Sequence, residues 1–250
     1  MKQPKNIIII GATSSIAEHC ARIWLKNGVA NLILIGRNVQ KMAHIAQDLR
    51  VRSPQSHVEV MEANFTEPQL IQELVNKICA DKIIDVVLIA HGSLADQNEC
   101  QKNLEQIEAS VTINGVSPIL FAEAFIAHME KANYGTLALI SSVAGERGRK
   151  SNYVYGAAKA LVTQYAQGLQ HRLAKTKVNV VLIKPGPTDT PMTAHLKQQN
   201  IPLADVKEVA QHIVSGVERG KTVIYTPHKW ALIMFVIRNL PRFIFNKMDI

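Results

Sequence analysis

The chain has 250 residues, of which 47% are hydrophobic and 19% are charged, and its net charge is +8. This balance excludes a disordered chain, a collagen and a coiled coil, and it is typical of a globular protein. Aromatic residues make up only 5%, which leaves little material for stacking nucleic-acid bases, so we expect no nucleic-acid partner. Cys20, Cys79 and Cys100 predict free thiols in a reducing compartment, and the histidines show no metal-ligand spacing.

Short, almost continuously apolar runs predict strands that are buried on both faces of a sheet. They are Asn6–Ile10, Leu32–Ile35, His57–Met61, Val86–Ala90, Thr136–Ile140, Val178–Ile183 and Thr222–Tyr225. Segments with helical spacing alternate with them, for example Ile16–Asn27, Asn38–Arg50, Leu104–Lys131 and Val154–Lys175. This alternation predicts an α/β fold, a single-domain doubly wound parallel sheet of the Rossmann type. No run reaches the roughly 18–20 apolar residues that span a bilayer.

The first strand leads directly into the small-residue turn Gly11-Ala12-Thr13-Ser14-Ser15-Ile16-Ala17, and a helix follows. Small residues let a pyrophosphate approach backbone N–H groups at the positive end of a helix, so the turn indicates a dinucleotide site. Arg37 ends the second strand, where an acidic residue would bind the 2′-hydroxyl of NAD(H). Its guanidinium favours the 2′-phosphate of NADP(H), and an exposed surface arginine is the alternative. Asn64 and Phe65, after the third strand, are placed to contact an adenine.

Tyr155 and Lys159 are four residues apart in a helical segment and therefore share one face of the helix. A nearby ammonium favours a phenolate and lowers the pKa of the phenol, which suits a group that passes a proton near neutral pH. Ser142 follows the fifth strand, at the sheet edge where ligands of open α/β sheets bind, and its hydroxyl could hold a carbonyl oxygen beside the phenol. The alternative is an ordinary surface pair.

With these residues the chain resembles the classical short-chain dehydrogenase/reductases over essentially its full length. Asn114, Ser142, Tyr155 and Lys159 match the catalytic tetrad of that family. The resemblance implies an NAD(P)-dependent oxidoreductase that transfers hydride between a nicotinamide and a carbonyl. It implies that Tyr155 is the general acid, that Ser142 orients the carbonyl, that Lys159 binds the nicotinamide ribose, and that Asn114 holds a proton-relay water.

The same resemblance implies a set of cofactor-binding residues. They are Gly11, Thr13, Ser14, Ser15, Ile16, Arg37, Asn38, Asn64, Phe65, Ala90, His91, Gly92, Tyr155, Lys159, Pro185, Gly186 and Thr188. Two stretches depart from the family pattern. Ser15 and Ala17 stand where the family usually has glycines, and Ile89-Ala90-His91-Gly92 replaces the usual Asn-Asn-Ala-Gly. Ser15 would need a backbone conformation that glycine accepts more readily, and His91 is as easily a packing residue as a cofactor contact.

The composition changes near residue 228, so we expect a Rossmann domain over residues 1–227 and an apolar, basic tail over residues 228–250. Trp230 to Ile237 is an unbroken apolar run between Lys229 and Arg238. Apolar residues flanked by cations suit the surface of an anionic membrane, and a helix packed on the domain or across a dimer interface is the alternative.

A narrower resemblance, to the reductases of decaprenylphosphoryl 2-keto-ribose, rests on Ser141 to Arg147, Asn152 to Gly156, Met192 to Lys197 and Leu240 to Lys247. It implies a polyprenylphosphoryl 2-keto-sugar as substrate, a flavin oxidase as partner, and a location in the cytoplasm, peripheral to the inner face of the cell membrane.

Several alternatives stay open. Arg147, Arg149 and Lys150 could contact a substrate phosphate or form a solvated basic loop, and His195 could line the substrate side. A soluble ketone, such as a ketoacyl thioester or a steroid, is an alternative substrate, with the tail then making a homo-oligomer contact or a pocket lid. A non-enzymatic dinucleotide sensor is a third hypothesis, which the intact tetrad disfavours.

Overall fold

One parallel sheet forms the centre of the computed structural model, which describes residues 5–198 and 200–248. Its strands are β1 (Asn6–Ile10), β2 (Asn31–Gly36), β3 (His57–Glu62), β4 (Val86–Ile89), β5 (Gly135–Ile140), β6 (Val178–Pro185) and β7 (Val223–Thr226). The order across the sheet is β3-β2-β1-β4-β5-β6-β7, and every neighbouring pair is parallel. The strand order therefore reverses between β1 and β4, which is where ligands of such sheets bind. The predicted doubly wound sheet is confirmed.

Each predicted strand agrees with an observed one to within two residues at either end. The helices are α1 (Ser15–Asn27), α2 (Val39–Arg52), α3 (Pro68–Cys79), α4 (Gln97–Lys102), α5 (Leu104–Val111), α6 (Ser117–Ala132), α7 (Tyr153–Arg172), α8 (Ala194–Gln198), α9 (Val206–Glu218), α10 (Lys229–Asn239) and α11 (Arg242–Phe245). Short 3-10 turns cover Val143–Glu146 and Pro191–Thr193.

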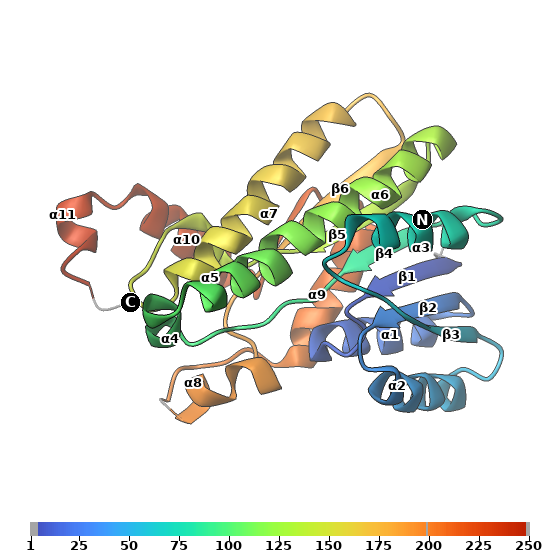
Figure 1. Ribbon diagram of the computed structural model, residues 1–250, viewed down its shortest axis with the longest axis horizontal. Helices are drawn as coiled ribbons and strands as arrows, with labels where there is room; N and C mark the ends of the chain where they lie inside the picture. Colours follow the sequence, from blue (N-terminus) through green and yellow to red (C-terminus); the bar gives the residue numbers. More distant parts are fainter. Residues whose placement is uncertain (1–4, 199, 249–250) are drawn as a thin grey trace.

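The sheet is sandwiched between two helical layers (Figure 1). Alternate residues of β1 show why its run is apolar throughout: Ile7 and Ile9 pack with the core beneath α1, α2 and α9, while Ile8 and Ile10 pack with the core beneath α3, α6 and α7. Successive side chains of a strand point to opposite faces, so a strand with two covered faces needs apolar residues at every position. Burying each such isoleucine contributes about 1.5–3 kcal/mol.

A π-helical segment, Thr112–Val116, joins α5 to α6. The resulting continuous helix, Leu104–Ala132, is long and apolar enough to cross a membrane by length and composition. The sequence analysis predicted this helix at Leu104–Lys131 but found no apolar run of spanning length in it, because charged residues interrupt its apolar runs. Phe121, Phe125 and Ile126 of α6 are fully buried against the sheet, so the protein core accounts for the apolar character of the helix.

The C-terminal helices α10 and α11 extend away from the sheet at one end of the molecule (Figure 1). Arg147 holds them: its guanidinium donates to the carbonyls of Ile237 and Leu240 and lies 3.8 Å from the centre of the Phe245 ring. Met234 is the buried residue of α10. The apolar tail expected over residues 228–250 is thus mainly helical in its described part, and residues 249 and 250, like residues 1–4, lie outside the described residues.

Candidate active site

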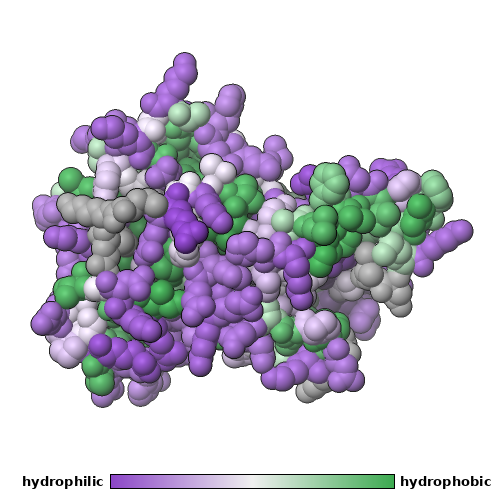
Figure 2. Space-filling view, turned by 180° about the vertical axis from the view of Figure 1, so that it is seen from behind, coloured by the Kyte–Doolittle hydropathy of each residue, from purple (hydrophilic) through white to green (hydrophobic). Residues whose placement is uncertain are grey.

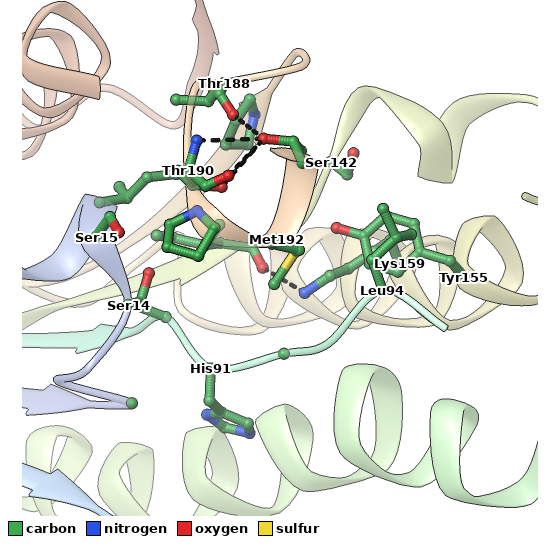
Figure 3. Close-up of a pocket in the computed structure, with 18 of the residues that line it drawn as sticks. Ser14, Ser15, His91, Leu94, Ser142, Tyr155, Lys159, Thr188, Thr190 and Met192 are labelled. Atoms are coloured by element: carbon green, nitrogen blue, oxygen red, sulfur yellow. Dashed lines mark hydrogen bonds between the residues drawn. The ribbon is translucent and has the colours of Figure 1, made fainter. Parts of the chain in front are cut away.

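A cavity of about 390 Å³ opens at the carboxyl end of the sheet (Figure 3). The segments that follow β1, β2, β4, β5 and β6 all contribute to its wall. Most residues expected at the cofactor site line it, namely Gly11, Thr13, Ser14, Ser15, Ile16, Arg37, Asn38, Phe65, Ala90, His91, Gly92, Tyr155, Lys159, Pro185, Gly186 and Thr188. Ser142 lines it as well, whereas Asn64 and Asn114 do not. A parallel sheet gathers residues that are far apart in the sequence because all its strands end at the same edge.

The turn after β1 has a backbone that only glycine accepts at its first position. Gly11 has φ +79°, and a Cβ there would lie 2.6 Å from the backbone of His91. Ser15, in contrast, begins α1, and Asn133 and Asn200 are the non-glycine residues with positive φ in the described parts of the chain. The conformational strain expected at Ser15 is therefore not found, and the turn keeps its close approach to the cavity with a single glycine.

Two cations lie on the part of the cavity wall that follows β2. Arg37 lies there, its guanidinium 5.8 Å from the centre of the Phe65 ring, and Lys41 of α2 lines the same wall. The sequence analysis missed Lys41, although its place three residues after Asn38, in the first turn of a predicted helix, could have indicated it. Asn64 does not face the cavity, because its side-chain oxygen accepts hydrogen bonds from the N–H groups of Thr66 and Glu67.

His91 is a packing residue with one edge on the cavity. Its Nε2 lies 2.9 Å from the Ser117 hydroxyl, and its ring makes an edge contact with Phe65, 4.7 Å between ring centres. In Figure 3 the ring points away from the middle of the cavity. Burial, together with the charges of Lys159 and Arg37, lowers the pKa of His91 well below its ordinary value, so the imidazole is neutral.

Asn114 lies in the π-helical segment and is fully buried directly behind Gly92. Its amide donates to the carbonyl of Ser110, 2.9 Å away, and its oxygen accepts from the N–H of Ser93, also at 2.9 Å. A Cβ on Gly92 would lie 2.7 Å from that oxygen and 3.5 Å from the Lys159 amine. Asn114 therefore fixes the loop after β4 from behind, and a π-helical turn at such a place often marks a functional site.

Ser142, Tyr155 and Lys159 meet on one wall of the cavity, where Tyr155 and Lys159 extend from α7 (Figure 3). The Lys159 amine donates to the carbonyl of Ile140, 3.1 Å away, and lies 5.8 Å from the centre of the Tyr155 ring. The Ser142 oxygen accepts from the N–H of Ala144 at 3.1 Å. The predicted pair is thus part of a cavity wall and not a surface pair.

The ionisation of this group differs from the sequence-based expectation. Burial raises the pKa of Tyr155 to about 12, and a hydrogen bond with Ser142 opposes the rise. Burial lowers the pKa of Lys159 to about 8. The expected lowering of the Tyr155 pKa by Lys159 was wrong for this arrangement, because burial disfavours the charged forms of both residues and Ser142, not Lys159, is the group that favours the phenolate.

Another part of the cavity wall is the segment after β6, which lies against Trp230 of α10. Pro185, Gly186 and Thr188 line the cavity, and a Cβ on Gly186 would lie 1.9 Å from the indole nitrogen of Trp230. Two regions of the cavity fit the two ends of a nicotinamide dinucleotide. The glycine turn with Arg37 and Lys41 fits the adenosine end, and the narrow segment at Gly186 fits the nicotinamide end. The family resemblance therefore agrees with the shape and charge of the cavity.

The basic residues between Ser142 and Tyr155 have different positions. Arg149 lines the cavity, Arg147 binds the C-terminal helices instead, and Lys150 is exposed outside it. His195 is also exposed and does not line the cavity, whereas its neighbour Leu196 does. The sequence analysis missed the apolar cavity residues Leu94, Ile113 and Leu196, since isolated apolar residues outside regular spacing give no pattern. Among residues 5–198 and 200–248, no cluster of His, Cys, Asp and Glu could hold a metal ion.

Known proteins of similar sequence and fold agree with this site. The family described as short chain dehydrogenase matches residues 5–201. An uncharacterised oxidoreductase of Streptomyces coelicolor is 27% identical over 98% of this chain and 96% of its own. Another, from Staphylococcus epidermidis, is 32% identical over 76% of this chain and 80% of its own. The fold resembles a short-chain dehydrogenase of Sphingobium yanoikuyae solved with NADPH, with a TM-score of 0.81, 23% identity, and 95% and 97% of the two chains covered.

The match to the family spans well over half of the chain, and it includes the glycine turn as well as Ser142, Tyr155 and Lys159. The chain therefore belongs to the short-chain dehydrogenase/reductase family of NAD(P)-dependent oxidoreductases.

Proposed function

We propose that the protein is an NADPH-dependent carbonyl reductase in which Tyr155 is the general acid. The observation that carries this proposal is the meeting of Ser142, Tyr155 and Lys159 on the wall of the same cavity that contains the Gly11 turn. A dinucleotide sensor would need the turn but not this group, so the arrangement supports catalysis.

The bound nicotinamide would supply a hydride to the carbonyl carbon of the substrate. Tyr155 would donate the proton that the carbonyl oxygen then requires, and its raised pKa keeps the hydroxyl protonated in the resting protein. The Ser142 oxygen accepts the N–H of Ala144, and its own hydrogen, which favours the Tyr155 oxygen in the resting protein, would be donated to the carbonyl oxygen of a bound substrate.

Lys159 and Asn114 would support Tyr155. The Lys159 amine is anchored on the Ile140 carbonyl, with hydrogens left for a ribose hydroxyl, and the charge it carries below about pH 8 would stabilise a tyrosinate after proton transfer. Asn114 would hold the relay region rigid from behind Gly92, through its bonds to Ser93 and Ser110.

A preference for NADPH over NADH rests on Arg37 and Lys41, two cations on the wall where a 2′-phosphate would lie. Guanidinium groups match phosphate oxygens in a two-pronged geometry. The similar protein of Sphingobium yanoikuyae was solved with NADPH, which supports the same choice.

The substrate we propose is a polyprenylphosphoryl 2-keto-sugar, with the protein bound peripherally to the inner membrane face. Leu232 and Phe235 of α10 and Phe243 of α11 are 71%, 62% and 69% exposed. Figure 2 shows apolar side chains gathered on this projecting part of the molecule. Lys229, Arg238, Arg242 and Lys247 flank them in the sequence. Apolar residues flanked by cations match an anionic leaflet, and α10 adjoins the cavity through Trp230 and Gly186.

Such a substrate implies that a flavin oxidase first makes the keto group, so this oxidase would be the partner. The second candidate is a soluble ketone. The apolar wall residues Leu94, Met192 and Leu196 support it, since they would bind a hydrophobic ketone that carries no lipid phosphate. In that case the exposed face of α10 and α11 would be a contact between copies of this chain.

The test is NADPH oxidation with farnesylphosphoryl 2-keto-ribose and, in parallel, with a water-soluble ketone of similar size. A kcat/KM at least tenfold higher for the lipid-linked sugar supports the proposed substrate. Equal or greater activity with the soluble ketone favours the second candidate, and no oxidation of NADPH with any ketone would refute the reductase.

A further inference from the structure

Arg149 is a cation in the wall of the cavity, and its guanidinium makes no ion pair with an acidic side chain of the described residues. It lies between the 3-10 turn after Ser142 and the start of α7, and it faces the same cavity as both Ser142 and Tyr155. Its Nε is buried without a hydrogen-bond partner among the described residues, and its Nη2 lies 3.7 Å from the sulfur of Met234, a weak acceptor. A buried guanidinium with unused donors is unfavourable unless a ligand satisfies it.

Glu146 is the acidic side chain whose charge acts on Arg149, but it makes no ion pair with the guanidinium. One of its carboxylate oxygens accepts from the Lys184 amine and the Tyr225 hydroxyl, each at 2.5 Å, and the other is buried without a hydrogen-bond partner among the described residues. No ion pair joins Arg149 to a carboxylate in the described parts of the chain. Burial lowers the pKa of Arg149 from its ordinary value, and Glu146 only partly opposes this. The positive charge of Arg149 is therefore available to a ligand in the cavity.

A second unpartnered polar atom lies nearby on the same wall. The side-chain oxygen of Asn152 is buried without a hydrogen-bond partner among the described residues, and Asn152 also lines the cavity. The wall thus presents an unpaired cation and a free acceptor within six residues of Tyr155. An anion and a hydroxyl of one ligand would satisfy both, as a sugar carrying a phosphate does.

We infer that Arg149 binds the phosphate group of the substrate while the carbonyl of the same molecule lies at Tyr155, with Asn152 accepting from a sugar hydroxyl. This inference rests on the proposed function and adds the group that selects the substrate. Met234 of α10 packs on the guanidinium and positions it, so the C-terminal helix takes part in building the subsite. Arg147 cannot serve in its place, because its guanidinium is bound to the carbonyls of α10 and to Leu240.

The phosphate could belong to a lipid-linked sugar or to a soluble sugar phosphate, which share the same chemistry. The experiment measures binding to protein saturated with NADP⁺, so that the cofactor's own phosphate sites are filled. The probes are farnesyl phosphate, farnesol and ribose 5-phosphate, with wild type, Arg149→Gln, Arg149→Lys and Lys150→Gln. Lys150→Gln is the matched control, since it removes one charge from the same loop at an exposed position outside the cavity.

We expect Arg149→Gln to weaken binding of farnesyl phosphate at least tenfold and to leave farnesol and NADP⁺ binding within twofold. Arg149→Lys should recover part of the affinity, because it restores the charge but not the two-pronged geometry. Lys150→Gln should stay within twofold of wild type. Tighter Arg149-dependent binding of farnesyl phosphate than of ribose 5-phosphate identifies a lipid-linked source, and the reverse order identifies a soluble one.

The inference is overturned if neither phosphate binds the wild type, if Arg149→Gln binds both phosphates as the wild type does, or if farnesol binds as tightly as farnesyl phosphate. These outcomes are independent of turnover. Arg149-dependent binding in a protein that oxidises no NADPH with ketones would refute the reductase and leave the phosphate site standing. Ketone reduction by a protein whose phosphate binding is unchanged by Arg149→Gln would support the reductase and refute the phosphate site.

Discussion

The Lys184 amine lies 2.5 Å from the carboxylate of Glu146, and both side chains are almost fully buried, with 4% and 2% exposed. This ion pair joins the 3-10 turn after Ser142 to the end of β6, directly before Pro185 and Gly186. The Tyr225 hydroxyl of β7 donates to the same carboxylate oxygen. The cavity walls that contain Ser142 and Gly186 are therefore tied together by one buried network.

Glu146→Gln should destabilise the protein strongly, because it leaves the Lys184 ammonium buried without a counter-charge. Breaking a buried pair in this way typically costs about 3–5 kcal/mol. The free energy of unfolding from urea titrations measures the effect. Glu146→Gln combined with Lys184→Met should lose less than Glu146→Gln alone, since no buried charge remains.

The control for this pair is the exposed ion pair of Asp189 and Lys197, whose atoms are 2.8 Å apart. Asp189→Asn should cost less than about 1 kcal/mol, because solvent screens exposed pairs. An equal loss of unfolding free energy in Glu146→Gln and Asp189→Asn would contradict a special role for the buried pair.

Tyr155→Phe should lower kcat by a factor of about 10²–10⁴, which is the usual contribution of general acid catalysis, and should leave the affinity for NADPH nearly unchanged. The substitution removes only the hydroxyl and keeps the ring that packs beside Lys159. Single-turnover rates and the quenching of protein fluorescence by NADPH measure the two quantities. An unchanged kcat would remove Tyr155 as proton donor.

Arg37→Asp should shift the preference from NADPH toward NADH, since a carboxylate repels a 2′-phosphate and accepts from a 2′-hydroxyl. The measurement is the ratio of kcat/KM for the two cofactors, which we expect to change by at least a factor of ten. Lys41→Ala should lower the same ratio in the same direction by a smaller amount. A ratio that stays constant in both variants would place the phosphate elsewhere.

The lowered pKa of Lys159 predicts that the stability of the protein changes with pH in a specific direction. Its pKa in the folded protein is about 8, below the ordinary value of 10.5. Between these two pH values the unfolded chain holds a proton that the folded protein has released, so the free energy of unfolding rises with pH. Relative to Lys159→Met, the wild type should therefore become more stable from about pH 8 to pH 10, by at most about 1.4 kcal/mol per pH unit.

Urea titrations at each pH would measure this difference, with Lys175→Met as a control at an exposed lysine. The difference between the wild type and Lys175→Met should not show the same rise. If the difference in unfolding free energy between the wild type and Lys159→Met does not change with pH over this range, the buried amine keeps its proton throughout.

Replacing Phe235 and Phe243 by serine should release the protein from anionic membranes. Both side chains are largely exposed on the projecting C-terminal helices, so the change removes apolar contact without opening the core. Co-sedimentation with vesicles of phosphatidylcholine and phosphatidylglycerol tests this, and binding of the wild type should weaken as salt is added.

Leu104→Ser is the matched control, since Leu104 is 81% exposed at the start of α5, outside these helices. It should bind vesicles as the wild type does. If the wild type itself stays in the supernatant, and the two serines instead convert a dimer to a monomer in size-exclusion chromatography, the face is a contact between copies of this chain.

Local patterns in the sequence predicted the strands and their parallel arrangement, and the family resemblance implied most of the residues at the cavity. Strands covered on both faces need apolar residues at every position, and parallel strands bring their following turns to one edge, so Gly11, Ser142 and Tyr155 could be assigned together from local pattern. The helical spacing of Tyr155 and Lys159 also placed both on one face before any coordinates were considered.

The surroundings of each of these groups depend on how the folded chain packs and could not be predicted. Asn64, Arg147 and Arg149 are alike in being polar residues on loops, yet one binds backbone N–H groups of the turn before α3, one holds α10 and one faces the cavity. The pKa of Tyr155 rises instead of falling because burial outweighs the hydrogen bond with Ser142. Burial and hydrogen-bond partners depend on residues distant in the chain, and no local pattern carries that information.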